Sequence, residues 1–99
     1  MPGYRVSQKA KDDIREIGRY TEAEWGRAQR RLYLSGMELS FRRLAENPQL
    51  AALRPEYSPP VRIQRYEKHL IVYVEQAYGI LIVRVLYESM DVPSRLGGT

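Results

Sequence analysis

The strongest pattern of apolar and polar positions covers residues 61–91, where three apolar runs are separated by two short polar breaks. β-Branched residues are frequent in these runs, which is typical of strands, and the breaks are short enough for hairpin turns. The first break is Glu67-Lys68, and the second, 76–79, ends in a glycine that can adopt a positive φ. The sequence therefore predicts a three-stranded antiparallel meander over residues 61–88.

The register of this meander follows from counting outward from each turn, with Tyr66 opposite His69 and Glu75 opposite Ile80. Side chains alternate along a strand, so this register sorts them onto two faces, of which we expect the almost purely aliphatic one to be the core. The expected core face carries Val61, Ile63, Arg65, Leu70, Val72, Val74, Leu81, Val83, Val85 and Tyr87. The expected outer face carries Arg62, Gln64, Tyr66, His69, Ile71, Tyr73, Ile82, Arg84 and Leu86.

A helix hairpin is predicted before the meander, over residues 8–46. Residues 4–7 read as a short edge strand, and Ser7 is placed to cap the first helix. Gly26 lies at the turn between the helices, and Pro48 follows the second helix, because proline disfavours helical geometry in the residue before it. We therefore expect one α+β domain over residues 1–99, with the hairpin packed on a three- to four-stranded, mainly antiparallel sheet.

The second predicted helix has two apolar stripes, centred roughly 140° apart. The first stripe suits close packing on the first helix near Gly18 and contains Ala28, Leu32, Ser35, Gly36 and Leu39. The second stripe contains Tyr33, Met37, Phe41 and Leu44. Two alternatives follow: either the sheet buries the second stripe while the first helix buries the other, or an apolar seam stays exposed for a partner.

Composition narrows the class of protein. The 99 residues contain sixteen Lys and Arg against twelve Asp and Glu, a net charge of +4 that suits an acidic partner. The sequence has no cysteine and a single histidine, so we expect a cytoplasmic protein with no metal and no cofactor. No apolar run approaches the length of a membrane span, so no membrane partner is expected.

Six short motifs are spread over nearly the whole chain. They are YRVS from Tyr4, YTEAEWG from Tyr20, LAENP from Leu44, HLIVYV from His69, IVRVL from Ile82 and MDVPSRL from Met90. Together with the order of the elements they resemble the toxins of the ParE/RelE superfamily, and specifically its ParE branch. The resemblance implies a toxin–antitoxin module with DNA gyrase as the target, in which the C-terminal segment of a small antitoxin wraps the toxin and neutralises it. We expect no direct DNA binding by this chain without its antitoxin.

The residues after the last strand distinguish the two branches of the superfamily. Related toxins commonly have VLH and an arginine-containing turn, whereas this chain has Leu86, Tyr87, Glu88 and Ser89. This difference favours binding over the mRNA cleavage of the RelE branch, although a ribosome-dependent endoribonuclease and a non-toxic assembly protein stay open as alternatives. A ribonuclease would need a base, a proton donor and cations. The candidates are Arg62, Tyr66, His69, Tyr73 and Arg84.

Two surfaces are candidates for binding the antitoxin through apolar anchors. One is the helix stripe of Tyr33, Met37, Phe41 and Leu44, and the other is the sheet patch of Ile71, Ile82 and Leu86. The tail over residues 90–99 is more apolar than a solvent-exposed flexible tail usually is, so it is a candidate for contact with the target. Its last residues, 97–99, are expected to be disordered. The target-binding candidates are Arg62, Arg84, Met90, Val92 and Arg95.

Overall fold

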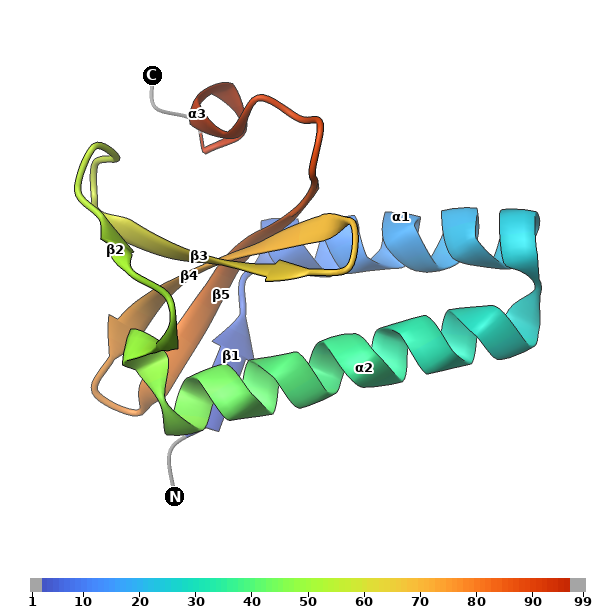
Figure 1. The fold of residues 1–99 in the computed structure, drawn as a ribbon, viewed down its shortest axis with the longest axis horizontal. Helices are drawn as coiled ribbons and strands as arrows, with labels where there is room; N and C mark the ends of the chain where they lie inside the picture. Colours follow the sequence, from blue (N-terminus) through green and yellow to red (C-terminus); the bar gives the residue numbers. More distant parts are fainter. Residues whose placement is uncertain (1–2, 97–99) are drawn as a thin grey trace.

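A computed structural model describes residues 3–96, in which two long helices pack on a five-stranded sheet (Figure 1). The α+β class, the helix hairpin and the three-stranded meander are confirmed, while the predicted disorder of residues 97–99 lies outside the described residues. The elements are β1 (Gly3–Val6), α1 (Gln8–Trp25), α2 (Arg27–Glu46), a 3-10 turn (Pro48–Leu50), β2 (Leu53–Arg54), β3 (Val61–Tyr66), β4 (His69–Gln76), β5 (Gly79–Tyr87) and α3 (Val92–Arg95).

The sheet has the strand order β1-β5-β4-β3-β2. The expected edge position of β1 is confirmed, and β1 pairs in parallel with β5, whereas the other strands are antiparallel. Two short elements were not predicted: β2, which pairs two residues in the loop before the meander, and α3, which forms in the tail. Both are too short for a periodic pattern to appear in the sequence.

Three local features position these elements as the sequence predicts. Ser7 caps α1, because its Oγ accepts from the backbone N–H of Ala10 at 3.1 Å and donates to the Val83 carbonyl at 2.8 Å. Gly26 separates α1 from α2 with φ 94°. Gly79 has φ 144°, and a Cβ there would lie 1.8 Å from the carbonyl oxygen of Gly3. Only glycine therefore allows β1 to pair beside the start of β5.

The predicted register is confirmed in the first hairpin and in half of the second. Pairs from Arg62 with Tyr73 to Tyr66 with His69 match the prediction, as does the pairing of Glu75 with Ile80. After the pair of Tyr73 and Ile82, a β-bulge leaves Val83 as an extra residue, because Val72 pairs with Arg84. The faces predicted for the rest of β5 are therefore exchanged, and Arg84 and Leu86 lie on the face opposite to Ile82.

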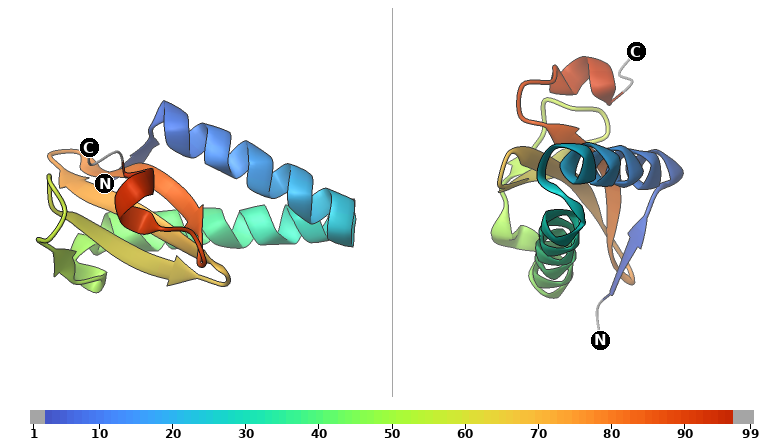
Figure 2. Two further views of the ribbon diagram at one scale, coloured as in Figure 1. Left: turned by 90° about the horizontal axis from the view of Figure 1, so that it is seen from above. Right: turned by 90° about the vertical axis from the view of Figure 1, so that its right-hand side faces the viewer.

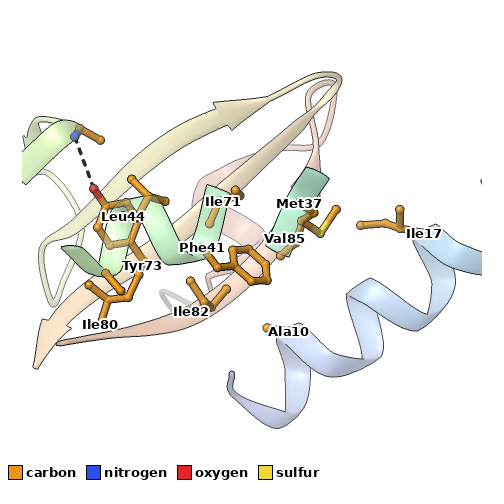
Figure 3. Close-up of a cluster of buried hydrophobic side chains, with 12 residues drawn as sticks. Ala10, Ile17, Met37, Phe41, Leu44, Ile71, Tyr73, Ile80, Ile82 and Val85 are labelled. Carbon is orange, nitrogen blue, oxygen red and sulfur yellow. Dashed lines mark hydrogen bonds between the residues drawn. The ribbon is translucent and has the colours of Figure 1, made fainter. Parts of the chain in front are cut away.

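The helices cover the face of the sheet that we expected to point outward, which corrects the predicted core. The hydroxyl of Tyr66 donates to the Tyr33 carbonyl and that of Tyr73 to the Pro48 carbonyl, each at 2.7 Å. The polar hydroxyls were the reason to expect this face on the outside. Each of them forms a hydrogen bond with a backbone carbonyl inside the fold. Figure 3 shows side chains of the main core, which contains Ala10, Ile17, Met37, Phe41, Leu44, Ala45, Ala51, Ile71, Tyr73, Ile80, Ile82 and Val85.

The far face of the sheet has a smaller apolar cluster. Figure 1 shows the tail and α3 on this side of the sheet, away from α2. This second cluster consists of Val61, Val72 and Leu86, with Tyr57 from the preceding loop and Val92 and Leu96 from the tail packed against it. The far face is therefore only partly covered. Figure 2 shows that α1 and α2 extend well beyond the sheet, so much of the helix hairpin has no strand beneath it.

Candidate functional site

Arg62, one of the two sheet arginines expected to contact a target, is neutralised within the fold. Its Nε and one terminal nitrogen donate to Glu75 Oε1 at 3.1 and 2.9 Å, and the other terminal nitrogen donates to the Ala51 carbonyl at 2.7 Å. The guanidinium thus ties β3 to β4 and to the loop before β2. The charge of Arg62 already has a carboxylate partner, so this residue has a structural role in the fold.

Arg84 is held in a similar way at the other side of the sheet. Its Nε and one terminal nitrogen donate to the two carboxylate oxygens of Asp13 at 2.8 and 2.9 Å, and its remaining nitrogen donates to the Arg95 carbonyl at 2.7 Å. The hydrogen bond with Asp13 raises the pKa of Arg84. This arginine therefore joins α1, β5 and the tail.

Asp13 is a residue whose role the sequence did not indicate. Strand β1 ends opposite Ile82, which leaves the next part of β5 without a neighbouring strand on that side, while β4 still pairs with its other side. Asp13 Oδ2 accepts from the backbone N–H of Val85 at 2.9 Å, so the carboxylate takes the place of a strand at this edge. The partners are 71 and 72 residues apart in the chain, and no local pattern relates residues at that separation.

The candidate ribonuclease residues are not assembled into one site. Tyr73 is 0% exposed, its hydroxyl lies 3.4 Å from the Ala51 N–H, and burial raises its pKa (Figure 3). Tyr66 donates its hydroxyl to α2, and the bulge places Arg84 on the face opposite to His69. A general base, a proton donor and a cation therefore do not converge on a common point among these residues.

His69 belongs to an aromatic cluster that attaches the β3–β4 turn to α2. The Tyr33 hydroxyl lies 2.6 Å from His69 Nδ1, and the His69 ring packs 5.5 Å from that of Tyr87. Burial lowers the pKa of His69 and raises the pKa of Tyr33 to about 12. Both groups are therefore neutral at pH 7, and their contact is a neutral hydrogen bond.

The residues predicted as antitoxin anchors are mostly in the core, so the premise that they form exposed surfaces is wrong. The helix stripe and the sheet residues Ile71 and Ile82 face each other and bury each other, and of the predicted anchors only Tyr33 remains partly exposed. The bulge places Leu86 in the second cluster. Only the first half of one alternative is confirmed: the sheet buries the second stripe of α2. The buried members are Met37, Phe41, Leu44, Ile71, Ile82 and Leu86.

All of the first stripe of α2 except Gly36 is exposed instead, which contradicts the predicted packing on α1. Arg30 occupies the space beside Gly18, where a Cβ would lie 2.9 Å from Arg30 Nε, so α1 approaches α2 through this side chain. Gly36 lies against the hydroxyl of Tyr66, and Leu39 and Leu50 line the same groove between α2 and β3. We define the leucine seam as Leu32, Leu39 and Leu50, which are 67, 58 and 49% exposed. Two small exposed residues accompany them on α2: Ala28 before Leu32, and Ser35 between Leu32 and Leu39.

A second surface lies on the far face of the sheet, between α3 and the loop before β3. This hollow, the tail groove, has a volume of about 1190 Å³. Of the tail residues predicted to contact a target, Met90 and Arg95 are exposed, while Val92 packs on the second cluster. The apolar lining of the groove comes from Tyr57, Pro59, Val61, Val74, Leu81, Val83, Pro93 and Leu96.

Two classes of site are absent from the described part of the chain. Within residues 3–96, no three His, Asp or Glu side chains gather as metal ligands would. No helix in the same range has the length and apolar character needed to cross a membrane. The leucine seam and the tail groove, both suited to protein contacts, are the candidate functional surfaces.

Comparisons with known proteins agree along almost the whole chain. Residues 4–92 match the family described as "ParE toxin of type II toxin-antitoxin system, parDE". The chain is 36% identical over 97 residues to Toxin ParE of Escherichia coli, covering 97% of this chain and 94% of the relative. It is 29% identical to Toxin ParE1 of Caulobacter vibrioides, covering 98% of this chain and 100% of the relative. A solved structure titled "Chromosomal ParDE TA system from P. aeruginosa" has the same fold, with a TM-score of 0.74 at 19% identity over 88% of this chain and 96% of that one.

Proposed function

Because the chain belongs to the ParE toxin family of type II toxin–antitoxin systems, we propose that it inhibits DNA gyrase by binding and that a cognate antitoxin neutralises it. The match of residues 4–92 to the family carries this proposal, since it includes the helix hairpin, all of the sheet except Gly3, and the start of the tail. Such a toxin would act in the cytoplasm.

Two features support binding rather than cleavage. The candidate ribonuclease residues are used within the fold, with Arg62 and Arg84 each paired to a carboxylate. Tyr87 stands at the position where related toxins commonly have histidine, and its ring packs against that of His69. A protein that acts by binding needs an exposed surface of suitable shape and polarity rather than a set of convergent catalytic groups.

We assign contact with gyrase to the tail groove and to the tail residues Met90, Val92 and Arg95. The groove offers apolar area that the tail leaves open, and an exposed methionine adapts readily to a partner surface. Arg62 and Arg84 then act indirectly, since Arg84 holds the backbone of Arg95 in place. Apolar burial in the groove would provide affinity, and the exposed Arg95 side chain would provide charge.

The proposal is tested with the purified full-length chain in two assays, gyrase supercoiling and mRNA cleavage on ribosomes. We expect inhibition of supercoiling, no cleavage, and recovery of supercoiling when the antitoxin from the neighbouring reading frame is added. Cleavage of mRNA would instead establish a ribonuclease. If neither activity is found while the antitoxin binds, the chain is a non-toxic assembly protein and the gyrase proposal is wrong.

The role of the tail is tested by deleting residues 92–99. We expect the deletion to abolish gyrase inhibition and to lower the midpoint of thermal unfolding by only a few degrees, because the buried members of the second cluster remain. Arg95→Glu is the matched point variant, since it keeps the backbone carbonyl that Arg84 uses. Collapse of the fold on deletion, together with normal inhibition by Arg95→Glu, would make the tail structural.

A further inference from the structure

The short helix α3 of the tail is held on the far face of the sheet by contacts of two kinds (Figure 1). Val92 and Leu96 pack on the second cluster, and apolar contact of this kind has no preferred direction. The Arg95 carbonyl accepts from one terminal nitrogen of Arg84 at 2.7 Å. Within residues 3–96, this is the only hydrogen bond that joins residues 91–96 to an earlier part of the chain. The orientation of α3 on the sheet therefore depends on Arg84.

The direction in which Arg84 points is set from the other layer of the fold. A guanidinium is planar and rigid, so fixing two of its nitrogens also fixes the direction of the third. The two carboxylate oxygens of Asp13 accept from Nε and one terminal nitrogen at 2.8 and 2.9 Å, and the other terminal nitrogen faces Arg95. The bond from the Val85 N–H, at 2.9 Å, holds the carboxylate itself in place. A series of directional contacts therefore runs from α1 through β5 to the tail.

The burial of this ion pair points to a role in positioning. The side chains of Arg84 and Asp13 are only 17 and 15% exposed, so both charges have lost most of their water. The cost of removing two charges from water largely offsets their attraction, and apolar residues in the same place are often as stabilising. An apolar pair could not direct a hydrogen bond at the Arg95 carbonyl, whereas a bidentate arginine fixes both distance and angle.

We infer that Asp13 is a positioning residue for gyrase inhibition, an inference that rests on the proposed function. We define the tail latch as Asp13, Arg84 and the Arg95 carbonyl. While the latch is closed, α3 forms one wall of the tail groove, which Pro93 and Leu96 line. When it is open, α3 keeps only contacts that have no direction, and the groove loses a defined wall. Gyrase then binds only the fraction of molecules whose tail is in place, which weakens its apparent affinity.

The state of the latch can be measured without gyrase, because the exposed Arg95 is a residue after which trypsin cleaves. Trypsin must bind the carbonyl of the cleaved bond in its oxyanion hole, and Arg84 already holds that carbonyl. The initial rate of cleavage between Arg95 and Leu96, followed by mass spectrometry of the released residues 96–99, therefore reports the fraction of open latch. Cleavage after the arginines of α1 is the internal reference, since global unfolding accelerates every site.

The main test compares Asp13→Asn with the parent in the trypsin assay and in gyrase supercoiling. The amide keeps the size of the side chain but cannot accept from both nitrogens of Arg84. We expect cleavage after Arg95 to be about tenfold faster and half-inhibition of gyrase to need about tenfold more protein, the effect of one charge-assisted hydrogen bond. Asp12→Asn is the matched control, because that carboxylate pairs with the exposed Arg15. It should leave both readouts within about twofold of the parent.

A second variant keeps Asp13 and changes the arginine. Arg84→Lys retains the positive charge but lacks the fork that reaches Asp13 and Arg95 together, so we expect changes of about tenfold in both readouts. Glu75→Gln controls for lost stability in the trypsin assay, since it removes the carboxylate partner of Arg62, which holds a loop rather than the tail. Its cleavage after Arg95 should stay within about twofold of the parent. Circular dichroism checks that every variant is folded at the assay temperature.

The outcomes separate this inference from the function on which it rests. If the parent inhibits gyrase and neither Asp13→Asn nor Arg84→Lys accelerates cleavage after Arg95, the latch does not hold the tail; the inference is wrong and the proposed function stands. Faster cleavage with unchanged inhibition also overturns the inference, because the tail then moves without consequence for gyrase. Equal acceleration at every trypsin site would show that Asp13 contributes only stability. If the parent does not inhibit gyrase, the proposed function fails and the inference fails with it.

Discussion

The two faces of the sheet are both rich in apolar side chains, yet the fold uses them differently. The face toward the helices is closed by α2, and its tyrosine hydroxyls find backbone carbonyls within the main core. The far face has only the second cluster, and the tail groove remains open beside it. Apolar content alone therefore does not decide which face becomes the core. The face that receives the helices is the one whose polar atoms gain partners there.

The largest expected effect is at the closed face. Phe41 is buried and its ring packs edge-on to that of Tyr4 at 5.3 Å between ring centroids, so Phe41→Ala leaves a cavity beneath α2. We expect the free energy of unfolding to fall by about 3–4 kcal/mol, as is usual for buried aromatic residues. Urea unfolding measures it. A loss below about 1 kcal/mol would mean that the helix face is less tightly packed than described.

A somewhat smaller effect is expected where the sheet meets α1. Asp13→Ala removes the carboxylate that pairs with Arg84 and leaves the Val85 N–H without its acceptor. We expect a loss of about 2–3 kcal/mol, because a mostly buried cation and a backbone donor both lose their partner. A double-mutant cycle with Arg84→Ala isolates the pair. A coupling energy near zero would contradict the structural role of Asp13.

The open face should respond weakly to the same kind of change. Leu96 is only partly buried against the second cluster, so truncation at this position leaves no closed cavity. We expect Leu96→Ala to lower the free energy of unfolding by less than about 1 kcal/mol. Measured by urea unfolding beside Phe41→Ala, it tests the contrast directly. Equal losses in the two variants would show that the tail is part of the main core.

The smallest effect is a pH dependence confined to the closed face. Burial lowers the pKa of His69 below its ordinary value of 6.5. The unfolded chain therefore takes up a proton first as the pH falls below about 6.5, and the stability that neutral His69 contributes above that pH is progressively lost. His69→Gln should flatten this part of the stability profile, which thermal unfolding between pH 5 and pH 8 measures. An unchanged profile would show that His69 is as hydrated as in the unfolded chain.

The sequence was sufficient to predict elements whose pattern lies in neighbouring residues. It was not sufficient to choose the core face of the sheet, because both faces have an apolar pattern. Helix ends, turns and most of the strand register could be predicted, because caps, glycines and alternation are properties of neighbouring residues. The core face could not, since both faces of the sheet are apolar. The bulge at Val83 has no signature in the chain, and it changed the side on which Arg84 and Leu86 lie.

The candidate site was less predictable for the same reason. Large apolar residues on α2 identified a helix with two apolar stripes, but which stripe meets the sheet depends on the tertiary fold. The Leu32 and Leu39 stripe was expected against α1, where Arg30 lies instead. Arginines on the sheet were likewise read as available charges, because their partners Glu75 and Asp13 are distant in sequence.

The parallel pairing of β1 with β5 has a consequence for the order of events during synthesis. Among the strands of residues 3–96, β1 pairs only with β5, and Asp13 of α1 also needs the backbone of β5. At about 5–20 residues per second, a ribosome takes roughly 4–15 s to advance from the first of these strands to the last. Strand β1 therefore has no strand to pair with until β5 has been made, although β1 and α1 can already contact α2. A product cut short before β5 would lack both the strand that holds β1 and the backbone donor that holds Asp13.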